Sequence, residues 1–146
     1  MAKGYPDFFG FSTFPWYGST ARDYADLGPL ADATEHVINA VLGRGVCLGG
    51  TAEIFAGEGM VNNLWCRLYI DGALIFNENV STLHYRNFSK NLDSLIYLLY
   101  FAQGREVAYV SISTNLTYMS SFDFRIYNNT GGAILVESSL YYTRIL

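Results

Sequence analysis

The residues best suited to catalysis or metal binding in this sequence are two histidines, His36 and His84, and two cysteines, Cys47 and Cys66. Neither histidine has another metal-binding side chain at i+2, i+3 or i+4, so the common ligand spacings are absent. The cysteines are too few for a disulfide framework and match no zinc motif. We expect them to be reduced thiols buried in strands, and we expect no metal site.

Catalytic motifs built on serine, glycine or paired carboxylates are also missing. The sequence contains no G-x-S-x-G, G-x-G-x-x-G or G-x-x-x-x-G-K-[ST] pattern. Glu53 and Glu58 flank a turn at Gly57 and could form the carboxylate pair of a glycosidase. Their spacing does not distinguish them from ordinary solvated charges. The sequence therefore predicts a protein that is not an enzyme and needs no cofactor.

Charge and hydropathy exclude two further classes of function. The net charge is −4 and the only lysines are Lys3 and Lys90, so no basic patch for nucleic acid or an anionic membrane is expected. The longest apolar runs, such as residues 95–102, are far shorter than the ~20 residues of a membrane-spanning helix. No hydrophobic region follows Lys3, so we expect no signal peptide and synthesis in a host cytoplasm.

A deficit of charge points to contacts between subunits. Charged residues make up 15% of the 146-residue chain, against about 25% in typical soluble domains. One interpretation is that other subunits cover part of the surface. The alternative is a surface of Ser, Thr, Asn and Tyr. Tyrosines expected in or beside strands suit protein interfaces or sugar stacking, although they also form cross-strand pairs: Tyr97, Tyr100, Tyr109, Tyr118, Tyr127, Tyr141 and Tyr142.

The elements that would position these side chains fall into two regions. Residues 1–22 form an extended arm rich in aromatic side chains, in which recurring proline and glycine prevent a regular helix or strand. The rings must be buried either on their own domain or on a neighbouring one. The arm residues that we predict to bind a partner are Tyr5, Pro6, Phe8, Phe9, Phe11, Phe14, Trp16 and Tyr17.

Residues 23–146 have the pattern of an all-β domain. Asp71 and Gly72 lie between two apolar runs, which predicts a two-residue hairpin turn. In residues 122–127, apolar side chains alternate with polar ones, and the turn residues 128–132 then predict a second hairpin with a return strand over residues 133–145.

Further strands are expected at residues 45–56, 95–102 and 107–113. Residues 34–42 fit either a helix or a strand, and we favour a strand because the segments after it are β. Residues 81–93 indicate a long loop or one helical turn. Seven to eight short strands with regular turn signals predict an antiparallel β-sandwich, jelly roll or barrel, and we favour the sandwich or jelly roll.

Two segments also resemble a known class of proteins. Residues 3–18 (KGYPDFFGFSTFPWYG) and residues 67–72 (RLYIDG) are similar in style to small β-rich virion proteins of tailed bacteriophages, such as capsid decoration and head or tail accessory proteins. The resemblance implies a jelly-roll-like domain with an extended arm, location in the virion, and no catalytic residues. It also implies a homotrimer or other symmetric oligomer that binds major capsid or tail proteins.

Two functional hypotheses follow. In the first, the chain is a virion structural protein that binds neighbouring subunits through its arm and sheet faces. In the second, it is a receptor- or glycan-binding module of a phage tail or fibre, in which tyrosines and carboxylates form the sugar platform.

Overall fold

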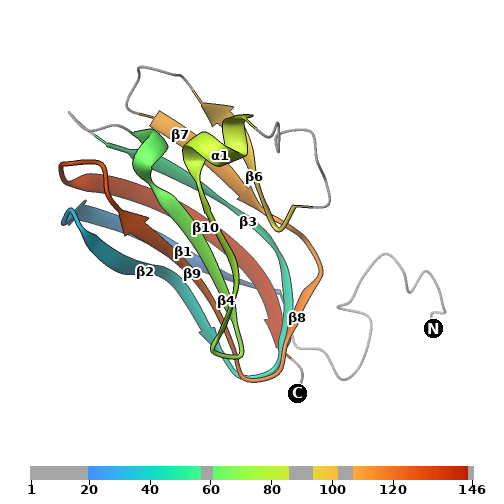
Figure 1. The fold of residues 1–146 in the computed structure, drawn as a ribbon. Helices are drawn as coiled ribbons and strands as arrows, with labels where there is room; N and C mark the ends of the chain where they lie inside the picture. The colour runs from blue at the N-terminus through green and yellow to red at the C-terminus, as the bar shows by residue number, and fades with distance from the viewer. Residues whose placement is uncertain (1–19, 57–60, 86–93, 102–106, 145–146) are drawn as a thin grey trace, which may run out of the picture.

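The computed structural model of the protein describes residues 20–56, 61–85, 94–101 and 107–144. The described residues form two antiparallel sheets packed face to face, with one short helix (Figure 1). The strands are β1 Ala21–Leu30, β2 Thr34–Leu42, β3 Gly45–Phe55, β4 Trp65–Ile70, β5 Ala73–Asn79, β6 Ile96–Phe101, β7 Val107–Ile112, β8 Leu116–Tyr118, β9 Ser121–Asn128 and β10 Ile134–Arg144. The helix α1 spans Val80–Tyr85, and a 3-10 turn, η3, spans Val61–Asn63.

The chain passes repeatedly between the two sheets. The first sheet has the strand order β1-β10-β3-β7-β6, with β8 also paired to β3. The second has the order β2-β9-β4-β5. Strands β1 to β4 therefore alternate between the sheets, and β9 and β10 do so again. Residues distant in the sequence become neighbours in this way, which fixes the two faces and two ends of the domain.

The core lies between the sheets and follows from the two-residue period of a strand. On β9, Phe122, Phe124 and Ile126 are fully buried, as their alternation with polar residues predicts. Cys47 and Cys66 are buried free thiols in β3 and β4, which confirms that expectation. Burial raises the pKa of Cys66 to about 12, so this thiol is inert at neutral pH.

The predicted hairpin at residues 128–132 is wrong. Strand β9 belongs to the second sheet and β10 to the first, so the turn crosses between sheets and does not join paired strands. The buried side chain of Asn128 donates hydrogen bonds to the carbonyl groups of Leu30, Ala31 and Gly132. Turn residues specify that the chain reverses, but the pairing partner depends on contacts that are distant in sequence.

Most of the other strand predictions are confirmed. Residues 34–42 form β2, residues 45–55 form β3, and β6 and β7 pair as an antiparallel hairpin. The described part of the chain has ten strands, more than the seven to eight expected, because β1 and β8 had no clean signal. Strand β1 begins at Ala21, within the range assigned to the arm, and α1 occupies residues 80–85.

The four strands at the ends of the two strand orders each contain extra residues relative to their partners, whereas the three-residue β8, which pairs only with β3, contains none. The extra residues are Ile38 in β2, Ile75 in β5 and Leu99 in β6, while residues 28–29 of β1 lie opposite the single residue Leu135. Such bulges twist an edge and interrupt its row of free backbone groups. All four edges are therefore poorly suited to adding a strand from another chain.

Gly50 provides a test of the close packing in the first sheet. A Cβ atom at this position would lie 2.6 Å from the carbonyl oxygen of Ser139, and backbone cannot move aside as a flexible side chain can. We predict that Gly50→Ala lowers the free energy of unfolding by about 1–3 kcal/mol in chemical denaturation.

Gly132→Ala is the matched control, because its Cβ would meet nothing within 4 Å. It should change stability by less than about 1 kcal/mol. Equal effects of the two substitutions would contradict the register of β3 and β10.

Candidate interaction surfaces

Both histidines lie among the described residues, where each contacts a nearby group. The Nε2 atom of His36 lies 2.8 Å from the carbonyl oxygen of Ala31, and His84 packs edge-on against Tyr85. Within the described ranges, no group of three or more His, Cys, Asp or Glu side chains could hold a metal ion. The same residues include no helix long and apolar enough to cross a membrane. Glu58 lies outside the described residues, so its pairing with Glu53 is untested.

The turn between β4 and β5 forms the centre of one end of the domain. Asp71 and Gly72 have positive φ angles of 54° and 81°, the backbone conformation of a tight type I′ turn. The Oδ1 atom of Asp71 accepts hydrogen bonds from the backbone N–H groups of Ser120 at 2.6 Å, Met119 at 2.9 Å and Ser121 at 3.1 Å. In return, the Asp71 N–H group donates to the Ser121 carbonyl at 2.9 Å.

These hydrogen bonds join three chain connections. Asp71 holds the link between β8 and β9, and the N–H group of Gly43, in the β2–β3 turn, donates to the Ser120 carbonyl at 2.9 Å. The backbone N–H group of Ser120, followed by that of Ser121, holds the pKa of Asp71 below its ordinary value. The sequence predicts the turn, but no local signal indicates that residues 119–121 would be its partners.

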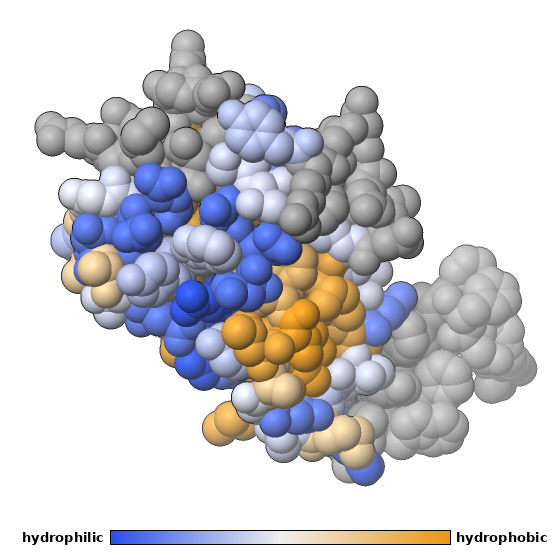
Figure 2. Space-filling model, viewed as in Figure 1, coloured by the Kyte–Doolittle hydropathy of each residue, from blue (hydrophilic) through white to orange (hydrophobic). Residues whose placement is uncertain are grey.

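Apolar side chains are exposed on this fixed framework. Leu42 is 70% exposed, Met119 64% and Leu74 47%. We call these three residues the apolar end. Figure 2 shows a hydrophobic area beside the lower part of the β4–β5 hairpin, next to a hydrophilic area over β2, β9 and β4. These residues lie on β2, on β5 and directly after β8, and exposed apolar side chains at one ordered end of a domain are typical of an interaction surface.

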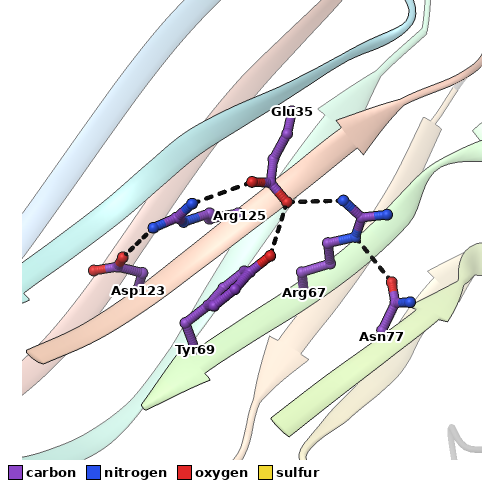
Figure 3. A network of polar contacts seen from close by, with 6 residues as sticks. All are labelled: Glu35, Arg67, Tyr69, Asn77, Asp123 and Arg125. Carbon is purple, nitrogen blue, oxygen red and sulfur yellow. Dashed lines mark hydrogen bonds and ion pairs between the residues drawn. The ribbon is translucent and has the colours of Figure 1, made fainter. Parts of the chain in front are cut away.

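A polar network covers the outer face of the second sheet (Figure 3). Glu35 lies at its centre and accepts hydrogen bonds from Arg67 at 2.8 Å, Arg125 at 3.1 Å and the Tyr69 hydroxyl at 3.2 Å. Partial burial works against the charged form of Glu35, but these three donors together outweigh it and leave its pKa lowered. Asp123 also pairs with Arg125, at 2.7 Å.

Aromatic rings stack on the same two arginines. The Arg125 guanidinium lies 4.3 Å from the centroid of the Tyr69 ring, and that of Arg67 lies 5.0 Å from the Tyr127 ring. Two cations and two carboxylates thus balance each other, and each ion pair contributes at most about 1 kcal/mol at this exposure. The arrangement links β2, β4 and β9 across the outer face of the second sheet.

The outer face of the first sheet has a different character. The strand register places Asp26, Glu137 and Glu53 side by side on β1, β10 and β3, followed by Tyr109 on β7. Like charges directly opposite each other are unfavourable. Two hydroxyl groups partly offset this repulsion, because Tyr24 donates to Glu137 at 3.0 Å and a hydrogen bond to Glu53 raises the pKa of Tyr109.

This acidic row borders a shallow depression. Its lining includes Glu53, Tyr109, Glu137 and the side chains of Thr51 and Ser139. In the sequence, Glu53 stands close only to Glu58. Its structural neighbour is Glu137. No local pattern predicts this contact, because Glu53 and Glu137 are far apart in the chain and meet only through the pairing of β3 with β10.

The tyrosines expected at the surface divide into two groups. Tyr100 and Tyr141 are about half exposed, at 50% and 45%. Tyr118 contradicts the expectation, because it is 1% exposed and its hydroxyl donates to the Thr143 carbonyl at 3.1 Å. Burial raises the pKa of Tyr118 to about 12. The predicted arm residues, from Tyr5 to Tyr17, lie outside the described residues.

Comparison with solved structures shows a likeness in fold to a phage capsid chain. No protein-family model and no curated protein matches the sequence. A chain of the cyanophage Pam1 capsid asymmetric unit matches with a TM-score of 0.51 and 16% sequence identity. The match covers 99% of this chain and 91% of that chain. At this identity, the likeness shows the fold alone.

The Asp71 hydrogen bonds generate a pH-dependent prediction. Because the pKa of Asp71 is below its ordinary value of 3.8, the stabilisation is present above that pH and is lost as the pH falls through the lower folded value. Asp71→Asn keeps an acceptor oxygen but has no charge. We predict that its melting temperature falls less between pH 7 and pH 3 than that of the wild type.

Asp71→Ala removes the acceptor as well, so it should melt below Asp71→Asn at pH 7. Identical pH profiles for the wild type and Asp71→Asn in thermal melts followed by circular dichroism would contradict this role of the carboxylate.

Proposed function

We propose that this chain is a non-enzymatic structural subunit of a phage virion, either a capsid decoration protein or an accessory subunit. The observation that carries the proposal is the likeness in fold, along 99% of the chain, to a chain of a cyanophage capsid asymmetric unit. The resemblance of residues 3–18 and 67–72 to small virion proteins of tailed phages points the same way. Two independent observations thus lead to one class of protein.

The strand order supports a jelly roll as the finer description of the fold. Four strands of each sheet follow the orders β1-β10-β3-β7 and β2-β9-β4-β5, while β6 extends the first sheet at its edge. In a jelly roll, two Greek keys fold into two such four-stranded sheets, and the fold recurs in viral capsids and lectins. The Greek-key connections of a jelly roll also account for the repeated passage of the chain between the two sheets.

The proposed mechanism is adhesion without chemistry. Burial of apolar side chains at a few well-packed positions supplies most of the binding free energy of an interface. The proposed partners are further copies of the chain, as a trimer or other symmetric oligomer, and major capsid or tail proteins of the particle. Support comes from the exposed apolar end and from the bulged edges, which leave sheet faces and loops as the surfaces for contact.

The depression on the first sheet favours a second candidate function, binding of a host glycan at a phage tail or fibre. Carboxylates beside tyrosine rings provide hydrogen-bond acceptors and an apolar platform, the combination that sugars require. Glu53, Glu137 and Tyr109 are placed together in this way. A glycan array separates the two candidates: saturable binding that Glu53→Gln and Tyr109→Ala each abolish would favour the second.

The first candidate function, a structural subunit of a virion, predicts that the chain co-purifies with virions. In cells that produce the particle, a tagged copy should sediment with virions in a density gradient and remain bound after washing in high salt. A chain lacking residues 1–18 should stay folded by circular dichroism but remain at the top of the gradient. Complete, infectious particles from which the full-length chain is absent would overturn the proposal.

A further inference from the structure

We propose that the apolar end, formed by Leu42, Leu74 and Met119, is the seat on which the aromatic arm of a second copy of this chain docks. This inference deepens the proposed function, on which it rests, by naming both halves of a contact between copies. One half is the described loop framework around Asp71, and the other is residues 5–17 of the neighbouring copy.

The apolar end, which is the proposed seat, is already ordered in the single chain. Hydrogen bonds that the backbone N–H groups of residues 119–121 donate to the Asp71 carboxylate fix the position of Met119 relative to the β4–β5 turn. Leu42 lies opposite Ser121 in the register of β2 and β9, so it belongs to the same end. A framework that is already ordered loses little conformational entropy on binding, which favours a stable contact.

The arm leaves the domain at the same end as the seat. Strand β1 begins at Ala21, which lies opposite Tyr142, and Tyr142 in turn lies opposite Cys47 of β3. Cys47 pairs with Leu116, which begins β8 just before Met119. When the apolar ends of two copies meet around a symmetry axis, the root of each arm is therefore beside the seat of the neighbour.

The length of the arm favours a neighbour over its own domain. Twenty residues precede β1, and they span up to about 70 Å when extended. The eleven residues of β10 span only about 36 Å. An extended arm thus exceeds the length of its own sheet and is long enough to reach a neighbouring copy.

The chemistry of the two halves is complementary. Each aromatic side chain of the arm buries 150–250 Å² when it docks, and the three seat residues are apolar and about half to two-thirds exposed. The methionine sulfur adds favourable contacts with aromatic rings. Because the edge strands are bulged, the arm binds through its side chains and need not add a strand to a sheet.

Cysteine crosslinking between two preparations tests the contact. One preparation carries Phe8→Cys, Phe11→Cys or Phe14→Cys in the arm, and the other carries Met119→Cys. The native cysteines stay in place because both are buried. After mixing and mild oxidation, we expect a disulfide-linked dimer containing one chain from each preparation. Leu135→Cys is the matched control and should give no dimer, because this 52% exposed residue near the start of β10 lies opposite Phe55, at the other end of the first sheet.

Three results are decisive. A chain that carries Phe11→Cys and Met119→Cys together and crosslinks only within itself would overturn the proposal, because the arm would then occupy its own domain. Absence of any crosslink from the three arm positions would also overturn it. Loss of oligomers in light scattering for Leu42→Ser with Met119→Ser, but not for Leu135→Ser, would support the proposal independently of the disulfide.

The docking proposal and the virion proposal can fail independently of each other. Particles that contain the chain, without any arm crosslink to Met119, would leave the virion role standing and refute this docking site. A crosslinked dimer from a chain that never sediments with particles would support the docking site and refute the virion role.

Discussion

Burial of the two inner sheet faces against each other is the constraint on which the rest of the structure depends. Phe122, Phe124 and Ile126 of β9 face inward and are fully buried. Because neighbouring residues of a strand point to opposite faces, the same strand must present Asp123 and Arg125 outward. The polar network around Glu35 is thus a direct consequence of core packing, and a one-residue slip in register would destroy both.

The edges, faces and one end of the domain are suited to different kinds of contact with a partner. The bulged edges discourage strand addition, and the second sheet balances its own charges around Glu35. The first sheet carries an acidic row beside a shallow depression, and the domain end presents apolar side chains on connections held by Asp71. The proposed contacts between subunits would therefore use the apolar end or a sheet face.

The sequence predicts local structure better than it predicts partners. Alternation identified β9, and the Asp71-Gly72 pair between two apolar runs indicated the turn that the backbone adopts. Strand β1 escaped notice because residues 27–30 include a glycine and a proline. The pairing of β10 with β3, and with it the Glu53–Glu137 contact, depends on core packing between segments far apart in the chain. No sequence pattern within either segment reveals such a contact.

Electron cryomicroscopy of the assembled particle would show whether the chain is a virion subunit. We expect repeated density for the two-sheet domain on the particle, with the apolar end turned toward a neighbouring copy and aromatic side chains packed on Leu42 and Met119. A particle map of comparable quality in which every density belongs to other proteins would refute the proposed virion role.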